Sequence, residues 1–192
     1  MKLVLASASA IRRDMLKAAG VAFDVRPAGV DEDAFKTSAA DAAASALAEA
    51  KALAGSAAAP GALVIGADSV VEGPDGDLVS KAPTREAAGA QLLGFRGRTH
   101  RIVSAAALAR DGRVVWRGRE EARLSVRAFS EAWLDAYLDA EWEEVRWCVG
   151  GYRMEALGVQ LFERVEGSYH AVLGLPLIPL LGALRDEGVL AG

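Results

Sequence analysis

The order of strand-like and helix-like segments predicts a mixed α/β sheet. The segment 2–26 alternates between strand, helix and strand patterns, the order of a parallel βαβ unit. Residues 62–66 are wholly apolar, which is typical of a strand buried on both faces of a parallel sheet. Residues 98–109 and 114–129 alternate around Asp111-Gly112, a turn signal that indicates an antiparallel hairpin. Parallel units followed by hairpins favour a mixed sheet over a strictly doubly wound fold.

The N-terminal elements follow from apolar periodicity and from residues that begin or end helices. The expected order is a strand at 2–6, a helix ending at Gly20, a strand at 23–26, an acidic loop at 27–35 and a helix from Ser38 to about Ala54. Gly20 is a suitable C-terminal cap because glycine readily adopts positive φ. Leu and Lys recur at helical spacing within 39–62, so this alanine-rich stretch is interpreted as a solvated helix rather than disorder.

The later elements follow from turn and capping residues. The strand at 62–66 is expected to end at 67–69 and to continue as Val70-Val71. A hairpin turn at Asp75-Gly76, a helix from Thr84 through Leu93 and the two long strands follow. The remaining expected elements are a helix from Ser130, strands at 159–164 and 169–173, and a helix from Pro176. Thr84 and Ser130 carry hydroxyls that accept a hydrogen bond from the first helical turn. Proline is well tolerated at a helix start.

Composition limits the class of protein. The 192 residues fit a single domain over 1–192, since no Pro-, Gly- or Ser-rich linker divides them. The net charge of −4 argues against bulk nucleic-acid binding. The single cysteine, Cys148, excludes an internal disulfide and favours a reduced, cytoplasmic setting. His100 and His170 are flanked by strand-like sequence, and both are interpreted as structural.

Targeting segments are not expected. The apolar run at 3–5 is shorter than the roughly 7–15 residues of a secretory signal core. No segment reaches the ~18 consecutive apolar residues of a membrane span. We therefore expect neither a membrane nor a nucleic acid among the partners.

The N-terminal stretch KLVLASASAIRR indicates a site for a polyphosphate. A short apolar strand ends at Ser7 and Ser9, and Arg12 and Arg13 then open a helix. A strand that stops at a serine-rich turn exposes backbone N–H groups and the positive end of a helix dipole. Arginine adds a planar, permanently charged fork that holds phosphate oxygens.

Other candidate residues are isolated charges. Asp68 follows the apolar strand, where a carboxylate could act as a general base or hold a metal; it could equally start a turn. Lys51 and Lys81 are each compatible with ordinary solvated lysines. Glu32 lies in a loop with two aspartates, an arrangement more often solvated than metal-binding. Glu155 follows a glycine pair that suggests close backbone approach.

These stretches together resemble the Maf, or septum-formation-inhibitor-like, family of nucleoside triphosphate pyrophosphatases. The matching pieces occur in order along nearly the whole chain: Leu5-Ala6-Ser7-x-Ser9-x-x-Arg12-Arg13, Val30-Asp31-Glu32, Leu47-Ala48-x-x-Lys51-Ala52, Gly66-Ala67-Asp68-Ser69-Val70-Val71, Lys81, Gly151-Tyr152-x-x-Glu155, Gly158, and Gly167-Ser168-Tyr169-His170-Ala171-Val172-x-Gly174-Leu175-Pro176-Leu177. Each piece alone is weak, but the ordered set is specific. The chain departs from the family in carrying Ala10 where proline is usual, and Ala82 between Lys81 and Pro83.

The resemblance implies an elongated mixed sheet with two lobes and a central cleft, similar to inosine triphosphate pyrophosphatases. It implies hydrolysis of the α–β phosphoanhydride of a nucleoside triphosphate with a divalent cation, Mg, Mn or Co. The proton acceptor would be Asp68, with Lys51 and Lys81 as further catalytic residues. Phosphate and metal contacts would fall to Ser7, Arg12, Glu32, Lys51 and Lys81. Arg13 would also bind the substrate. A metal would lie between Glu32 or Asp68 and the phosphate oxygens. The protein would form a homodimer.

Base preference depends on three positions that the resemblance marks. Members acting on dTTP and UTP typically carry Arg, Thr and Gln where this chain has Ile11, Ser69 and Glu155. Members acting on 7-methyl-GTP carry a bulky apolar residue at the first position and Glu at the third. A carboxylate accepts hydrogen bonds from the donor edge of a guanine, so 7-methyl-GTP or another modified nucleotide is expected as the substrate. The segment 167–170 looks more like the dTTP and UTP type, which stays open as the alternative.

A second class of function is a nucleotide-binding regulator of septation that does not turn over its ligand. The intact set of Asp68, Lys51 and Lys81 argues against it, because a pure binder needs no base.

Overall fold

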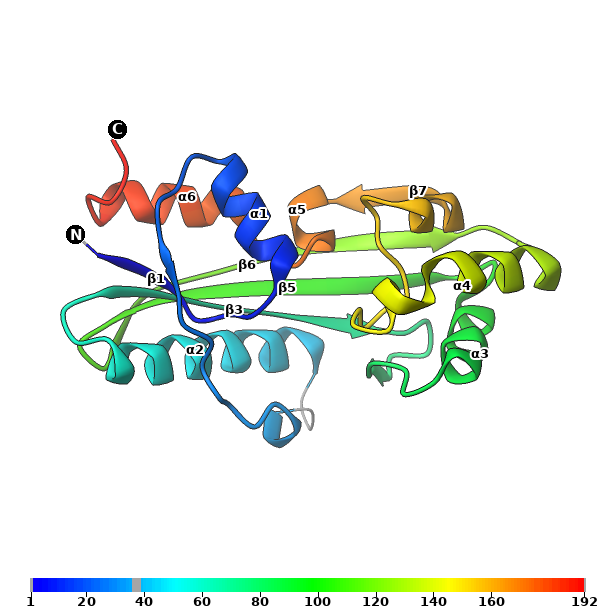
Figure 1. The fold of residues 1–192 in the computed structure, drawn as a ribbon, viewed down its shortest axis with the longest axis horizontal. Coiled ribbons are helices and arrows are strands. Elements are labelled where there is room, and N and C mark those ends of the chain that lie inside the picture. The colour runs from blue at the N-terminus through cyan, green and yellow to red at the C-terminus, as the bar shows by residue number, and fades with distance from the viewer. Residues whose placement is uncertain (1, 36–38, 192) are drawn as a thin grey trace. The chain divides into compact units, whose positions relative to one another are not determined.

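In the computed structural model, which describes residues 2–35 and 39–191, seven strands of the described chain form one mixed sheet. The strand order is β2-β1-β3-β5-β6-β7, and β4 pairs with β3 (Figure 1). The strands are β1 (Leu3–Leu5), β2 (Asp24–Val25), β3 (Leu63–Glu72), β4 (Leu78–Val79), β5 (Thr99–Arg110), β6 (Arg113–Val126) and β7 (Phe162–Gly167). β1 is parallel to β2 and β3, whereas β4 and β7 pair antiparallel with their neighbours. The predicted mixed α/β fold is thus confirmed.

Apart from α5, the α-helices follow the expected order along the chain. They are α1 (Ala10–Ala18), α2 (Ala40–Ala58), α3 (Arg85–Phe95), α4 (Glu131–Val145), α5 (Tyr169–Val172) and α6 (Leu177–Asp186), with 3-10 turns η1 (Asp33–Phe35) and η2 (Leu157–Leu161). Thr84 and Ser130 cap α3 and α4 as predicted. Ser38, the predicted helix start, lies outside the described residues. No described helix has the length and apolar character needed to cross a membrane.

The chain divides into two compact units, each assembled from separate segments. The first unit comprises Met1–Ser69, Val103–Glu121 and Ser168–Gly192, and the second comprises Val70–Ile102 and Ala122–Gly167. The chain passes from one unit to the other four times, so the units are not successive domains joined by a single linker. The single domain over 1–192 stays a prediction.

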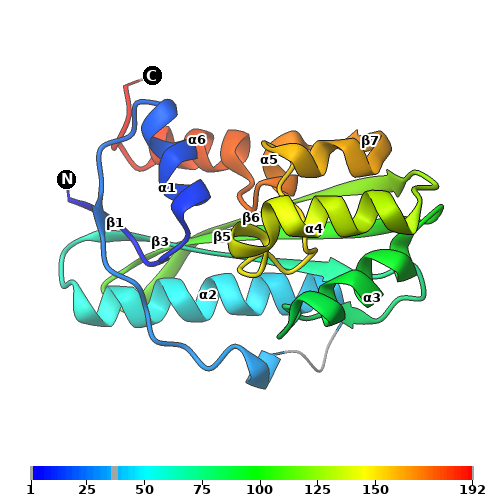
Figure 2. The same ribbon diagram turned by 45° about the vertical axis from the view of Figure 1, so that its right-hand side comes forward.

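The first unit packs helices on both faces of its strands. Figures 1 and 2 show α1 and α6 on one face and α2 on the other. Leu63, Ile65 and Ala67 of β3 join the core under α1 and α6. Because side chains alternate along a strand, Val64, Gly66 and Asp68 face the α2 side.

Close approach between α2 and β3 requires small residues. A Cβ at Gly66 would lie 2.2 Å from the Ala48 carbonyl oxygen and 2.3 Å from the Ala52 nitrogen. At Gly55 it would lie 2.7 Å from a methyl of Val64. The alanine-rich segment is helical, as predicted, but the expectation of a solvated helix is wrong. Its small side chains bury one whole face against the sheet.

Two strand expectations need correction. β3 does not end at residues 67–69; it runs unbroken to Glu72, so Asp68 lies inside a strand. Beyond Ile65, where its pairing with β1 ends, β3 pairs with β4 at Val71 and Glu72, and it also neighbours β5 in the sheet. Residues 169–173 were expected as a strand, but 169–172 form α5, because the Ser168 hydroxyl accepts from the Ala171 N–H and caps a helical turn. The strand expected at 159–164 begins only at Phe162, after η2.

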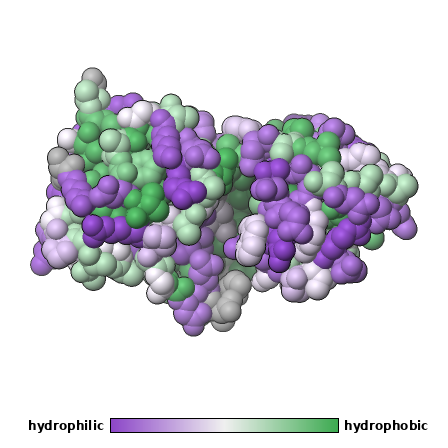
Figure 3. All heavy atoms as spheres, viewed as in Figure 1, coloured by the Kyte–Doolittle hydropathy of each residue, from purple (hydrophilic) through white to green (hydrophobic). Residues whose placement is uncertain are grey.

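The surface mixes polar and apolar side chains. On the face shown in Figure 3, hydrophobic atoms of the first unit gather over α6, where Ile178 is exposed. Polar residues intersperse elsewhere on the first unit and across the second. The homodimer stays a prediction.

The second unit contains a buried histidine among aromatic rings. His100 stacks on Phe95 with ring centroids 4.5 Å apart, and its Nε2 lies 2.6 Å from the Tyr152 hydroxyl. Its Nδ1 has no hydrogen-bond partner among the described residues. Burial lowers the pKa of His100 from 6.5 to about 4. The environment agrees with the predicted structural role.

We expect this histidine to make stability depend on pH. Since its pKa is lower in the folded than in the unfolded state, the unfolded chain binds more protons between pH 6.5 and about 4. The free energy of unfolding should therefore fall as pH falls through that window, with His100 contributing about 2 kcal/mol of the loss by pH 5. Urea unfolding at pH 7.5 and 5 measures it. The double variant His100→Phe/Tyr152→Phe removes both polar partners. Its free energy of unfolding should fall less than that of the wild type between pH 7.5 and pH 5, and an equal fall would contradict this source of pH dependence.

Candidate active site

Lys51 and Asp68 form a buried ion pair in the first unit. Lys51 lies on the face of α2 that packs on β3, and its Nζ is 3.2 Å from Oδ1 of Asp68 and 2.6 Å from Oε1 of Glu32. The side chains of Lys51 and Asp68 are 8% and 13% exposed, and that of Glu32 is 48% exposed. The close helix–strand contact at Gly66 therefore brings the lysine to the carboxylate.

Arg12 is the centre of a second, more connected group. Each of its five N–H groups points to an acceptor of the protein. Those acceptors are Gly174 O at 2.7 Å, Ala67 O at 3.0 Å, Ser69 Oγ at 3.1 Å, Ser7 Oγ at 3.2 Å and Asp68 Oδ1 at 3.5 Å. The residue is 8% exposed. The guanidinium thus joins α1, β3 and the loop between α5 and α6, and in this conformation it has no N–H left for a phosphate oxygen.

A hydroxyl pair extends this network away from Asp68. Ser69 Oγ lies 2.8 Å from Ser104 Oγ, and the Ser104 hydroxyl donates to the Ala171 carbonyl at 2.6 Å. Ser104 is wholly buried. Sequence reasoning missed it, although a lone serine in the apolar strand 102–109 was a signal, because a buried hydroxyl needs a partner. Ser69, assigned to base specificity by the resemblance, has its hydroxyl engaged here.

The turn before α1 places the remaining N-terminal candidates. Ser7 Oγ accepts from the Ser9 N–H at 3.3 Å, and Ser9 in turn caps α1. Ile11 is half-buried and packs against the core of the first unit. Arg13 is half-buried on the same helix. Successive helix positions differ by about 100°, so Arg13 faces a different direction from Arg12.

The pairing leaves one oxygen of the central carboxylate available. Arg12 and Lys51 both contact Oδ1 of Asp68, and no described residue bonds to its Oδ2. Two cations and the two carboxylates of Asp68 and Glu32 balance in charge. A carboxylate oriented by fixed cations through one oxygen can accept a proton from water at the other.

The acidic residues fit a magnesium-type cation of the kind that also binds phosphate. No group of three or more His, Cys, Asp or Glu gathers as ligands within the described chain. Mg²⁺ in phosphate-transfer sites is typically held by one or two carboxylates plus phosphate oxygens rather than by a full protein cage. Either Glu32 or Asp68, which flank the same ammonium group, supplies such a carboxylate.

Lys81 and Glu155 belong to the second unit, and both side chains are exposed. Lys81 follows β4, and Glu155 follows the glycine pair 150–151. The pKa of the Cys148 thiol is raised by burial first and then by the charge of Glu155, while Arg153 and Lys81 lower it. The charges of Lys81 and Glu155 therefore both act on the Cys148 thiol.

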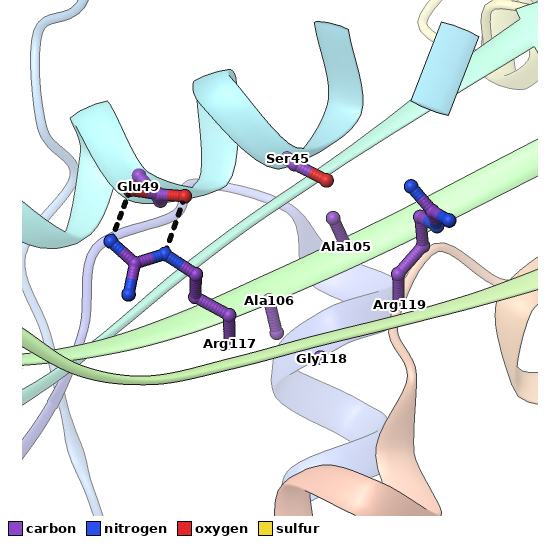
Figure 4. A pocket seen from close by; sticks show the side chains of 7 residues that line it. All are labelled: Ser45, Glu49, Ala105, Ala106, Arg117, Gly118 and Arg119. Atoms are coloured by element: carbon purple, nitrogen blue, oxygen red, sulfur yellow. Dashed lines mark hydrogen bonds and ion pairs between the residues drawn. The ribbon is translucent and has the colours of Figure 1, made fainter. Parts of the chain in front are cut away.

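A surface pocket of about 250 Å³ lies elsewhere in the first unit (Figure 4). It is lined by Ser45, Glu49, Ala105, Ala106, Arg117, Gly118 and Arg119. Arg117 makes two hydrogen bonds to Glu49, at 2.7 and 2.9 Å, and Arg119 pairs with Asp41 at 3.3 Å. Its arginines are thus each balanced by a carboxylate, and none of the predicted site residues lines it.

Comparison with known proteins gives close relatives over the full length. The model of a family described as Maf-like protein matches residues 2–187. A protein of Caulobacter vibrioides named nucleoside triphosphate pyrophosphatase is 50% identical, with 97% of this chain and 96% of the relative covered. A protein of the same name from Paramagnetospirillum magneticum is 48% identical, with 97% and 99% covered.

One solved structure is more distant. It is a nucleoside-triphosphatase, or dITP/XTP pyrophosphatase, of Mycobacterium abscessus, with 21% identity, a TM-score of 0.35, and coverage of 66% of this chain and 73% of that one. A likeness at this distance supports no conclusion on activity.

Proposed function

This chain belongs to the Maf-like protein family, and on that premise we propose that it is a nucleoside triphosphate pyrophosphatase. The reaction splits the α–β phosphoanhydride and yields a nucleoside monophosphate and pyrophosphate. The observation that carries the proposal is the buried Asp68, held through one oxygen by Lys51 and Arg12. Full-length relatives at 48–50% identity that are named for this activity support it.

The chemistry assigns each residue a step. The attacking water gives a proton to Oδ2 of Asp68 while the oxygen of that water forms a bond to the α-phosphorus. The bond from that phosphorus to the bridging oxygen breaks, and the electron pair leaves with pyrophosphate. Cations stabilise the charge that develops there, a role we assign to Lys51, Arg13 and Lys81. A divalent cation, when held by Glu32 with phosphate oxygens, would neutralise further charge.

Arg12 receives a different role from the one that the resemblance implies. Its N–H groups are engaged by the protein, so we assign it to holding Asp68 and the surrounding loops in place. A direct phosphate contact would require one of these bonds to open.

The base preference that we propose is 7-methyl-GTP. Glu155 accepts hydrogen bonds from a guanine edge, and its charge attracts the positive ring of a methylated guanine. The alternative within the family is dTTP or UTP, which the segment 167–170 favours. The remaining alternative is a regulator of septation that binds a nucleotide without cleaving it. Any measurable release of pyrophosphate would exclude this alternative.

We expect 7-methyl-GTP to have a higher kcat/KM than GTP, dTTP or UTP, and Glu155→Gln to reduce this preference by roughly ten- to a hundredfold, since one charged hydrogen bond is worth about 1.5–3 kcal/mol. The measurement is pyrophosphate release from the four nucleotides with Mg²⁺, Mn²⁺ or Co²⁺. Glu163→Gln, an exposed acid of β7, is the matched control and should leave the preference unchanged. If dTTP or UTP is the best substrate of the wild type, the base assignment fails while the pyrophosphatase assignment survives.

A further inference from the structure

The segment from Val149 to Glu155 is irregular, yet side chains of three different elements hold it. It contains neither helix nor strand. Gln91 Nε2 of α3 donates to the Val149 carbonyl at 2.8 Å, and the Tyr137 hydroxyl of α4 donates to the Gly151 carbonyl at 3.1 Å. His100 of β5 bonds to the Tyr152 hydroxyl at 2.6 Å. All of these residues belong to the second unit.

Three of these four anchoring side chains are buried, so their bonds are formed away from water, whereas Gln91 is half-buried. Tyr137, Tyr152 and His100 are 1%, 7% and 2% exposed. Burial raises the pKa of both tyrosine hydroxyls, so both stay protonated. Hydrogen bonds in such an environment are strong, and a partner left alone there is costly. These hydrogen bonds therefore restrict the conformation of segment 149–155.

The C-terminal part of the segment is held by packing and by charge. A Cβ at Gly158 would lie 2.6 Å from the Arg153 carbonyl oxygen and 3.1 Å from the Tyr137 hydroxyl, so η2 lies directly on this backbone. Arg153 Nη2 pairs with Glu141 of α4 at 2.9 Å. Glu155 stands two residues beyond Arg153, at the end of a segment whose backbone is held at several points.

We propose that Gln91, Tyr137 and the His100–Tyr152 pair are positioning residues that hold segment 149–155, and with it Glu155, in the geometry that selects the base. This inference rests on the proposed function. An exposed glutamate on a loose loop would meet many nucleobases with similar contacts. A glutamate on a fixed backbone discriminates between bases, because the wrong hydrogen-bonding edge cannot be accommodated by movement.

The test uses Tyr137→Phe, which removes one oxygen and keeps the ring. Asp139→Asn is the matched control, since it lies on the same helix and loses an ion pair with Arg85 but touches no part of the segment. Gln91→Ala removes a different anchor and serves if Tyr137→Phe does not fold. Two quantities are measured: backbone hydrogen exchange of residues 149–156, and kcat and KM for 7-methyl-GTP and UTP.

We expect faster exchange within the segment in Tyr137→Phe and in Gln91→Ala, and wild-type exchange in Asp139→Asn. The ratio of kcat/KM between the two nucleotides should fall about tenfold in both anchor variants, through KM rather than kcat, because the phosphates are held elsewhere.

Three other outcomes overturn the proposal in distinguishable ways. Unchanged exchange in the anchor variants means that these side chains do not hold the segment. Faster exchange with an unchanged nucleotide ratio means that the segment is held but does not select the base. If the wild type cleaves no nucleoside triphosphate, both the proposed function and the role in base selection fail. Hydrogen exchange then still shows whether these residues anchor the segment.

Discussion

Replacing Asp68 by asparagine should lower kcat by about 10²–10⁴-fold on every nucleotide, the usual cost of losing a general base. An amide cannot accept the proton of the attacking water. Its oxygen can still accept hydrogen bonds from Lys51 and Arg12, so the side chain should stay in place. Lost charge beside two buried cations should reduce stability, so circular dichroism must first establish folding at the assay temperature. Pyrophosphate release then gives kcat, and calorimetry gives nucleotide affinity.

Asp77→Asn is the control for this substitution, because Asp77 is an exposed aspartate of the second unit. It should retain wild-type kcat. A kcat of Asp68→Asn within tenfold of the wild type, with the fold intact, would remove Asp68 from the role of base.

Local signals were sufficient to predict most elements of the fold. The hairpin between β5 and β6 forms at Asp111-Gly112, where φ is +48° and +75°, values that suit this pair. The caps at Thr84 and Ser130 and the helix start after Pro176 were also confirmed. Each of these depends on hydrogen bonds or backbone angles within a few residues, which the sequence encodes directly.

Errors arose where distant contacts decide the structure. Whether β3 stops near Asp68 or continues depends on β5 and β4, whose partners in the sheet lie many residues away. The burial of α2 depends on how closely an alanine-rich helix can approach a glycine in a strand, which composition alone does not reveal. The path of the chain through two units, with four crossings, had no local signal at all.

The candidate site shows the same limit. Asp68, Lys51 and Arg12 were singled out from sequence, and the structure brings them together. Their mutual geometry was not predictable, because Arg12 reaches across 162 positions to the Gly174 carbonyl. Ser104 went unnoticed since its role exists only through Ser69 and Ala171.

The geometry of Arg12 yields the second large expected effect. Arg12→Lys keeps the positive charge but replaces five donors in a planar fork by three on a flexible stem. At least two buried acceptors among those that Arg12 now satisfies would lose their partner, at about 1–3 kcal/mol each. We expect the free energy of unfolding to fall by about 2–6 kcal/mol. We also expect kcat to fall for all nucleotides alike, because Asp68 loses one of the groups that orient it. Urea unfolding and steady-state kinetics on the nucleotide panel measure both.

Arg13→Lys provides the contrast that decides between orienting Asp68 and binding phosphate. Arg13 is half-buried on the same helix, and we assign it to the phosphates, so its lysine variant should raise KM and the inhibition constant of pyrophosphate while leaving unfolding unchanged. Arg12→Lys should show the reverse: large changes in stability and kcat, and little change in pyrophosphate inhibition. Lysine keeps the charge but loses the bidentate fork, so at a phosphate contact the change weakens ligand binding and leaves the fold intact. A fork that joins α1, β3 and the loop after α5 cannot be replaced by an ammonium group, so at Arg12 the change lowers stability. If Arg12→Lys unfolds like the wild type and weakens pyrophosphate inhibition instead, Arg12 is a phosphate ligand and its five protein contacts open when substrate binds.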